Sequence, residues 1–425
     1  EISLGLVGSE MCIRDRSCVR SFSSGATGTV WGEGVAAVFL KPLERAKRDG
    51  DHILGVIKGS AMNNDGASNG LTAPNAQAQS QVLIDAWKNA KVDPKTIQYI
   101  EAHGTGTELG DPIEIKGIQD AFSRYTDKKQ FCGIGTVKTN IGHTVAASGI
   151  ASLIKVILAM QHGVLPPSIN FKQANSYINF TDSPVYFVDR IQKWKKGENP
   201  RRAGISAFSF NGTNVHLVLE EPESIVSGEE IKEKPELFVL SAKNDKSLKH
   251  YVEDCYRYIN VQKNDSFDSI IKTAQVNKEP FENRLAFVVK DVQELKRKLK
   301  YIADNGLQAD DTQKIFYGEI KGKHKNIQKL DNSLVERVAD IDRQTVAQQA
   351  ELLNQLAQAF VEGKQIDFAE LFHYGTFAKA RLPIYPLDFK RYWPAEPFPE
   401  KKDRPKEIEH PLLNTVSYTH LTLPT

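Results

Sequence analysis

The chain has 425 residues and a formal charge of +2, with 40% hydrophobic and 25% charged residues. This length is enough for two or three domains of roughly 150 residues each, and the composition is that of ordinary globular domains. The balanced charge gives no basic field for a nucleic acid, and no apolar run approaches the roughly 20 residues that would span a membrane.

The cysteines and the two ends of the chain indicate where the protein works and how far the sequence can be interpreted. Its cysteines lack CxxC pairing and there is no secretory signal, so we expect a reduced, cytoplasmic protein without a zinc site. Residues 1–16 and 416–425 resemble translated sequencing adapters, and we exclude them from the fold, as one would exclude an expression scar. We therefore expect the natural gene to continue in both directions.

Between Gly28 and Pro222, predicted strands and helices alternate. The apolar run 35–40 predicts a strand buried on both faces, as does 53–57. A helix is predicted over 77–90, and a short strand that ends in glycines over 97–102.

The next predicted helix begins at Asp111 and Pro112, as an N-cap and a first-turn proline. Apolar residues at helical spacing predict another helix over 146–160, ended by Gly163. Further strands are predicted at 185–188 and 215–219. This alternation predicts an α/β domain of layered sheets and helices.

A charged segment at 223–234 marks a domain boundary. A smaller α/β unit is predicted beyond it, with strands at 237–240 and 285–289 and a helix over 343–362 that ends at Gly363. The prolines of 382–386 favour an extended segment, and a charged linker follows at 401–409.

The strongest chemical pattern is the run 101–112, EAHGTGTELGDP. Its histidine, His103, lies where a buried strand gives way to a glycine-rich loop, and glycines let a backbone approach a ligand closely. Thr105 and Thr107 add hydroxyl groups beside it. A lone His-Gly pair is usually a structural turn, and in this setting a turn and a site are about equally supported.

Two further patterns accompany it. The motif KTNIGH runs from Lys138 to His143, and His143 lies just before the N-terminus of a predicted helix. The helix dipole disfavours a positively charged imidazolium at this end. A neutral imidazole could then donate a hydrogen bond to an oxyanion. Taken alone, His143 as a helix cap and Lys138 as a solvated side chain explain this motif at least as well. The run 206–216 alternates small and aromatic residues in a predicted bend, where packing is the simpler interpretation. No Walker A or dinucleotide-binding pattern is present.

Together these motifs resemble the condensing enzymes of fatty acid and polyketide synthesis. The GEG turn at 32–34 and the loop 64–75 also match that family, and the resemblance covers about residues 18–222. It implies the C-terminal part of a ketosynthase of a modular polyketide synthase, with the thiolase-like layered α-β-α-β-α fold. The implied reaction is decarboxylative Claisen condensation of an acyl thioester with malonyl carrier protein.

The resemblance also implies roles for these residues. His103 and His143 would decarboxylate malonyl and stabilise the oxyanion, while Lys138 orders the site. Thr105 and Thr107 would contact the phosphopantetheine arm of an acyl carrier protein, with no cofactor or metal bound directly. Phe210 matches a gating phenylalanine. The full-length protein would be a homodimer that binds neither nucleic acid nor membrane.

Two departures from the family pattern stand out. No cysteine has the context of the family's nucleophile: Cys18 lies too close to the GEG turn, next to Val19 and Arg20. We therefore expect this chain by itself to be inactive. Ser209 and Asn211 replace glycines of the gate, which puts the geometry of the gate in question.

The remaining segments resemble linkers of such synthases. The run 237–243 is similar to the start of a post-ketosynthase linker, and 382–393 to the end of the linker that normally follows an acyltransferase. Too few residues lie between them for an acyltransferase, and no GxSxG elbow is present, which implies a separate acyltransferase.

We therefore divide the chain into ketosynthase at 17–222, a linker or acyltransferase-docking region at 223–396, and a charged linker leading into the start of a dehydratase at 397–415. Two alternatives to an elongating ketosynthase stay open. One is a ketosynthase that only transfers acyl chains, which commonly lacks the first histidine. The other is a docking scaffold for a separate acyltransferase.

Overall fold

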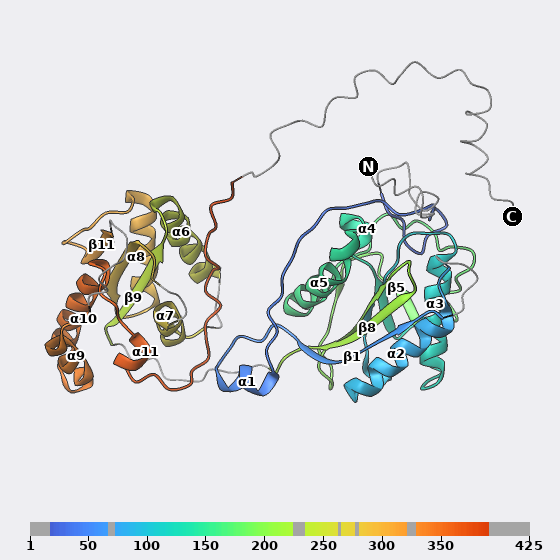
Figure 1. Cartoon of the computed structure of the whole chain (residues 1–425), viewed down its shortest axis with the longest axis horizontal. Coiled ribbons are helices and arrows are strands. Elements are labelled where there is room, and N and C mark those ends of the chain that lie inside the picture. Colours follow the sequence, from blue (N-terminus) through green and yellow to red (C-terminus); the bar gives the residue numbers. More distant parts are fainter. Residues whose placement is uncertain are drawn as a thin grey trace, which may run out of the picture.

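The computed structural model describes residues 18–66, 73–223, 234–261, 265–276, 280–320 and 329–390. They form two lobes, at 18–223 and 234–390, which Figure 1 shows side by side and joined near α1 (Leu43–Arg48). The expected dehydratase start, the two adapter-like ends and Trp393 lie outside the described residues.

A six-stranded sheet forms the centre of the first lobe, in the order β1-β8-β7-β2-β3-β5. Strands β7, β2, β3 and β5 run parallel, while β8 is antiparallel to both β7 and β1. The strands are β1 (Val56–Asn64), β2 (Tyr99–Glu101), β3 (Cys132–Gly135), β5 (Val185–Phe187), β7 (Arg202–Phe208) and β8 (Thr213–Glu220). A separate pair comprises β4 (Val164–Leu165) and β6 (Gln192–Lys193).

Helices cover the two faces of this sheet. They are α2 (Ala76–Ala90), η3 (Pro94–Thr96), α3 (Gly110–Ser123), α4 (Lys138–Ile141), η4 (Val145–Ala147) and α5 (Ser148–His162). Neighbouring strand residues point to opposite faces: Ile100 joins the core of α2 and α3, and Tyr99 joins the core of α5. The sheet is therefore one layer between two helical layers, as the alternation of elements predicted.

Helix boundaries agree with the sequence signals at several places. The side chain of Asn75 caps α2 by accepting the backbone N–H groups of Gln77 and Ala78. Gly163 ends α5 at a φ of 62°, a left-handed conformation that suits glycine. The predicted helix over 146–160 is confirmed as α5 with the short η4 turn before it.

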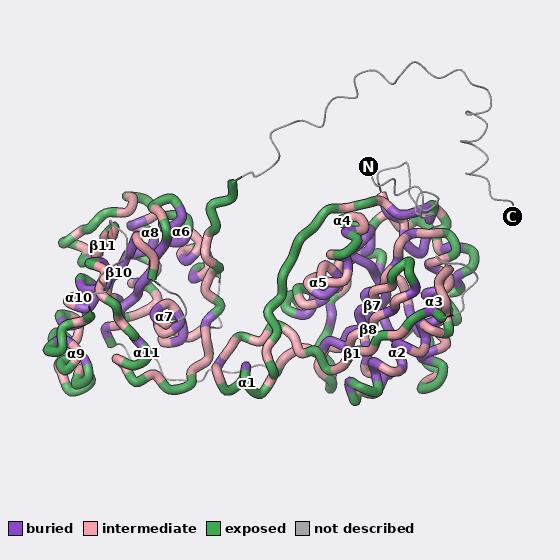
Figure 2. The backbone as a smooth tube through the Cα atoms, viewed as in Figure 1, coloured by how far each residue is buried: buried purple, intermediate pink, exposed green. Residues whose placement is uncertain are grey.

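The strand predicted at 35–40 is wrong. This segment makes no strand, and Val35 and Phe39 are 99% and 92% exposed; Figure 2 shows the segment as a mostly green arch between α1 and the rest of the lobe. A strand needs a neighbour to pair its backbone groups, and no strand among the described residues pairs with it. The other early strand, predicted at 53–57, forms later, as β1, and its expected burial on both faces is wrong, since Leu54 and Ile57 are 45% and 41% exposed.

The predicted capping role of Asp111 is also wrong. Leu109 occupies the N-cap of α3 and makes no side-chain cap bond. The buried Asp111 carboxylate instead accepts backbone N–H groups from Phe22, at 2.6 Å, and Gly106, at 3.1 Å. Asp111 therefore binds backbone N–H groups of two loops instead of those of its own helix. These bonds connect the segment around Phe22 to the loop after β2.

One helix among the described residues, Val145–His162, is long and apolar enough to cross a membrane by length and composition. Lys155 lies in this helix and pairs with the buried Glu101 at 2.6 Å. The inner face of α5 packs on the sheet through residues such as Val156 and Met160. Packing on the sheet therefore accounts for the apolar residues on the inner face of α5, whereas Leu158 elsewhere on this helix is 48% exposed.

The second lobe confirms the predicted small α/β unit. Its sheet, in the order β11-β10-β9, is antiparallel. The strands are β9 (Glu236–Ala242), β10 (Asn283–Val289) and β11 (Ile315–Glu319). The helices are α6 (Asp245–Val261), α7 (Phe267–Val276), α8 (Val292–Asn305), α9 (Asn332–Ala339), η5 (Ile341–Arg343), α10 (Val346–Val361) and α11 (Phe368–Leu371).

This lobe has a core on each side of its sheet. The side chain of Leu285 joins α6, α7 and α8 on one face, and that of Ala286 joins α9 and α10 on the other. The buried Arg284 donates to the carbonyl oxygens of Phe360 and Lys364 at the end of α10. The segment 382–386 forms neither helix nor strand, and Leu382 and Tyr385 pack against the first of these cores.

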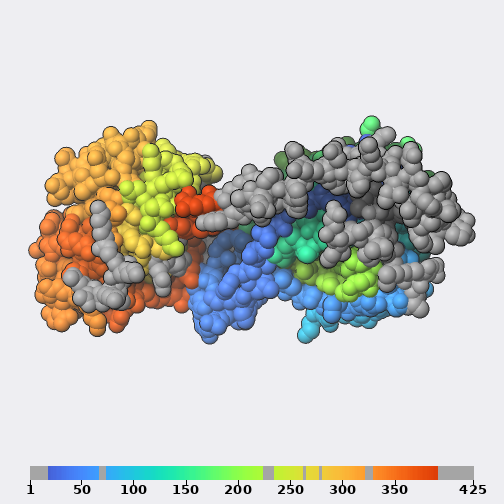
Figure 3. Space-filling model, turned by 45° about the horizontal axis from the view of Figure 1, so that its top comes forward, coloured from blue at the N-terminus to red at the C-terminus, as the bar shows by residue number. Residues whose placement is uncertain are grey.

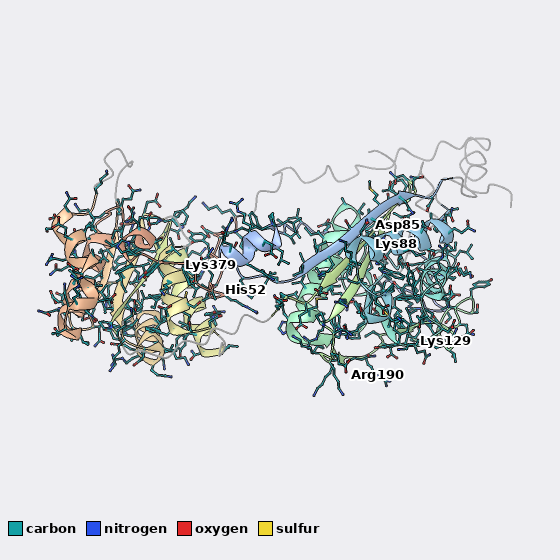
Figure 4. The ribbon with its side chains drawn as sticks, turned by 90° about the horizontal axis from the view of Figure 1, so that it is seen from below. His52, Asp85, Lys88, Lys129, Arg190 and Lys379 are labelled. Carbon is teal, nitrogen blue, oxygen red and sulfur yellow. The ribbon has the colours of Figure 1, made fainter. Side chains whose placement is uncertain are left out.

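A short junction joins the two lobes. The backbone N–H of Lys379 donates to the carbonyl of Gly50, and its side chain pairs with Asp51 at 2.6 Å. Figure 4 shows Lys379 and His52 at this junction, and Figure 3 shows the segment around α1, in blue, against the second lobe. Gly50 has a φ of 62°, and a Cβ there would lie 1.9 Å from the carbonyl oxygen of Phe377, so this close approach requires glycine.

Candidate active site

Three segments of the first lobe bring the predicted histidines together. His103 follows the end of β2, His143 follows α4, and the hairpin of β7 and β8 ends beside them. The two imidazole rings lie 5.4 Å apart, edge to face. Two histidines that are 40 positions apart in the sequence therefore lie side by side, as a shared site would require.

The hydrogen bonds of each ring define its tautomer. Nδ1 of His103 accepts the backbone N–H of Phe208 at 3.3 Å, and Nδ1 of His143 accepts that of Val145 at 3.1 Å. A neutral imidazole carries one hydrogen, so in both rings it is on Nε2. Each histidine is therefore left with one free N–H donor.

The pKa values of both histidines favour the neutral ring. Burial, together with the positive charge of Lys138 and with His143, holds the pKa of His103 well below its ordinary value. Burial and Lys138 lower the pKa of His143 to about 4. Both rings are therefore neutral near pH 7.

Lys138 lies behind His103 and is 1% exposed, which rules out the solvated side chain left open by the sequence. Its Nζ is 3.5 Å from Nδ1 of His103. Burial lowers the pKa of Lys138 to about 8, although the carboxylates of Glu114 and Glu101 act in the opposite direction. This lysine therefore supplies a second donor to the same nitrogen of His103.

Glu114 holds the backbone of the first histidine loop. Its two carboxylate oxygens accept the N–H groups of His103, at 2.7 Å, and Gly104, at 2.8 Å. The sequence interpretation missed this residue, although its place one helical turn inside α3, facing the loop, was a usable signal. It also missed Phe208, whose ring lies 5.7 Å from that of His103.

The two threonines lie next to each other in the loop after His103. Their hydroxyl oxygens are 3.4 Å apart, and the carbonyl of Thr105 accepts a hydrogen bond from Thr29. Both side chains are partly exposed, so their hydroxyl groups can reach a bound molecule.

The gate-like residues form the turn of the β7–β8 hairpin. Phe210 is 64% exposed at its tip. The N–H of Gly212 donates to the carbonyl of Ser209, and the side chain of Asn211 accepts the N–H of Thr213. The substitutions at Ser209 and Asn211 therefore preserve a closed turn that leaves Phe210 exposed.

The glycine turn at 32–34 lies against the second histidine. Gly32 donates to the carbonyl of His143, whose own N–H donates to the carbonyl of Val30, and Trp31 lies 5.6 Å from the imidazole ring. A Cβ on Gly32 would be 2.2 Å from the carbonyl oxygen of Ile141. This turn needs glycine because it passes so close to the end of α4.

Two family matches agree with this geometry. Residues 54–172 match the family described as "Beta-ketoacyl synthase, C-terminal domain", and residues 175–288 match "Ketoacyl-synthetase C-terminal extension". The ketosynthase from module 6 of the bacillaene synthase of Bacillus subtilis 168 superposes with a TM-score of 0.78 and 34% identity, over 92% of this chain and 67% of that one.

The chain belongs to the beta-ketoacyl synthase family.

Curated relatives place it among the ketosynthases of polyketide synthases. It is 38% identical to polyketide synthase PksL of Bacillus subtilis over 91% of the chain, and 50% identical over 48% to a phenolphthiocerol/phthiocerol polyketide synthase of Mycobacterium tuberculosis. The chain spans 9% and 11% of the length of these two proteins. The thiolase-like layered fold and the ketosynthase assignment are confirmed, and the residue roles stay predictions.

Two of the three described cysteines are buried away from the histidine pair. Burial raises the pKa values of the Cys132 and Cys255 thiols, which are fully buried, and Cys18 is half-buried. The described residues also hold no cluster of three or more potential metal ligands. The histidine pair and the side chains that hold it are therefore the candidate site among the described residues.

Proposed function

We propose that this chain contributes the histidine half of a ketosynthase active site that elongates acyl chains by decarboxylative condensation. The observation that supports this most strongly is the pair of neutral rings 5.4 Å apart, each with Nδ1 occupied and the Nε2 hydrogen free. Two such donors can meet at one oxygen that gains charge during a reaction.

In the proposed reaction, a malonyl thioester reaches the site on the phosphopantetheine arm of an acyl carrier protein. The bond between its carboxylate and α-carbon breaks, CO2 leaves, and the electron pair remains as an enolate. His103 and His143 donate to the enolate oxygen. The α-carbon then attacks the acyl thioester held by a cysteine outside the described residues, and the cysteine leaves as a thiolate.

Other residues have supporting roles in this proposal. Lys138 holds His103 in its tautomer by occupying Nδ1 together with the N–H of Phe208. Thr105 and Thr107 would bind the phosphopantetheine arm through their adjacent hydroxyl groups. Phe210, exposed at the hairpin tip, would gate the acyl chain. The full-length protein would work as a cytoplasmic homodimer.

Counting CO2 against product tests this function and separates it from acyl transfer alone. The full-length ketosynthase that carries this sequence, given an acyl thioester and malonyl carrier protein, should release one CO2 for each β-ketoacyl product. The intact His103 supports elongation. Acyl transfer without CO2 release would favour the non-elongating alternative instead.

We propose a docking role for the second lobe. It has its own two cores, and its elements occupy the chain between β9 and residue 390, where an acyltransferase would otherwise lie. The module would then depend on a separate acyltransferase that docks here.

The isolated segment 237–393 should unfold in one cooperative transition, because both hydrophobic cores of the second lobe consist of its own residues. It should neither hydrolyse nor transfer a thioester. Circular dichroism during heating and a thioester assay measure both properties. It should also retain a partner acyltransferase in a pull-down with the purified proteins. Acyl transfer by the segment alone would contradict a scaffold role.

A further inference from the structure

We infer that Glu101 and Lys155 form a buried pair that positions the two histidines relative to each other. Neither residue reaches the site itself, so both are positioning residues. The inference builds on the proposed function, because the alignment of the two rings matters most if they act on one oxygen.

Glu101 is the last residue of β2 and its side chain is 0% exposed. One carboxylate oxygen, Oε1, accepts the backbone N–H of Val137 at 2.5 Å. The other, Oε2, accepts from the hydroxyl of Tyr99 at 2.7 Å and from Lys155 Nζ at 2.6 Å. Both oxygens of this buried charge are therefore hydrogen-bonded or ion-paired, as a buried carboxylate requires.

These contacts join the segments that carry the site. His103 lies two residues after Glu101 on the same strand end. Val137 directly precedes Lys138, the first residue of α4, and α4 leads to His143. One carboxylate thus fixes the separation between the strand that carries one histidine and the helix that leads to the other.

Lys155 supplies the positive charge opposite Glu101 and holds its carboxylate in place. It comes from α5, its side chain is 9% exposed, and its Nζ also lies 3.0 Å from the Tyr99 hydroxyl. Without this lysine the carboxylate would remain buried with only neutral donors. Since Lys155 sits on the helix that begins just after His143, the pair also holds α5 against β2.

Glu114 cannot replace this link. Its oxygens bond the backbone of His103 and Gly104 from α3, on the other side of the loop, rather than the backbone that leads into α4. Loss of Glu114 would loosen one histidine, whereas loss of Glu101 would let the two move apart. A displacement near 1 Å between reacting groups can lower a rate about a hundredfold.

The test compares variants of the full-length ketosynthase in acyl loading and in condensation. Glu101→Gln keeps the shape of the side chain but leaves Lys155 without a carboxylate. We expect kcat for condensation to fall about ten- to a hundredfold, while KM for malonyl carrier protein and the rate of acyl loading change by less than about twofold. Glu101→Gln combined with Lys155→Met removes both charges and should recover part of the loss, since paired residues are not additive.

Glu221→Gln is the matched control. Glu221 pairs with Arg201 at 2.6 Å and is 17% exposed, but at the end of the β7–β8 hairpin opposite the histidines. It should leave kcat within about twofold of the wild type, because no histidine segment depends on it. Tyr99→Phe removes one hydrogen bond to Glu101 and should lower kcat by a few-fold. This milder variant tests the positioning role if Glu101→Gln does not fold.

The outcomes separate the proposed function from the positioning role. A wild type that forms no β-ketoacyl product refutes the proposed function and the positioning role with it. A wild type that elongates, with Glu101→Gln or Tyr99→Phe unchanged in kcat, refutes the positioning role alone. Equal losses of loading and condensation, or an equal loss in Glu221→Gln, would also overturn it.

Discussion

Replacing His103 with alanine in the full-length ketosynthase should abolish most elongation while leaving acyl loading nearly intact. The variant removes one of two donors to the enolate oxygen, and loss of one such donor typically costs about 2.7–4 kcal/mol. This corresponds to a decrease in the elongation rate on the order of a hundred- to a thousandfold. Loading of the cysteine involves no malonyl group, so it should depend less on this ring.

Intact-mass measurement of the loaded enzyme beside a product assay shows both halves of this prediction. His162→Ala is a suitable control, because His162 is an exposed histidine at the end of α5, away from both rings. It should load and elongate as the wild type does. Normal elongation by the His103 variant would mean that His103 is structural and that the site assignment is wrong.

The 425-residue chain expressed by itself should form no carbon–carbon bond. Thiolate attack needs a cysteine in the site, and the described cysteines are buried or lack the context of a nucleophile. A β-ketoacyl product made by this chain alone, in a mass-spectrometric assay, would contradict this expectation.

The same chain should also expose an unusually large apolar surface. A groove of about 570 Å³ runs between the segment 33–36 and α5, and Leu158, Phe39 and Val35 are 48%, 92% and 99% exposed. Exposed apolar side chains gathered along one groove mark an interaction surface or a tendency to aggregate. We expect strong binding of an apolar dye and self-association in sedimentation, both suppressed when the chain is joined to the preceding half of a ketosynthase.

The sequence was most informative where a residue's chemistry and its local geometry agree. Glycines, threonines and a histidine after a short strand indicated the loop at 103–107, and helical spacing indicated α5. The structure brings His103 and His143 together, with Lys138 behind the first ring. The helical spacing of apolar residues in α5 could be predicted because it depends only on neighbouring residues of the same helix.

Predictions failed where a residue depends on partners far away in the chain. The apolar run at 35–40 has the composition of a buried strand, but no described strand pairs with it. Asp111 has the position of an N-cap, but backbone donors from the loop and from Phe22 bind it instead. Glu101 carries no local signal of its role, because Val137 and Lys155, which bind its carboxylate, lie far away in the chain.

The central claim is that His103 and His143 are neutral donors that each present an Nε2 hydrogen to the same oxygen. Nitrogen NMR of the full-length ketosynthase, labelled at histidine, tests it most directly near pH 7. We expect both rings to be neutral, with Nδ1 unprotonated and the hydrogen on Nε2, as the bonds from Phe208 and Val145 require. A protonated imidazolium at either position, or a hydrogen on Nδ1, would contradict it.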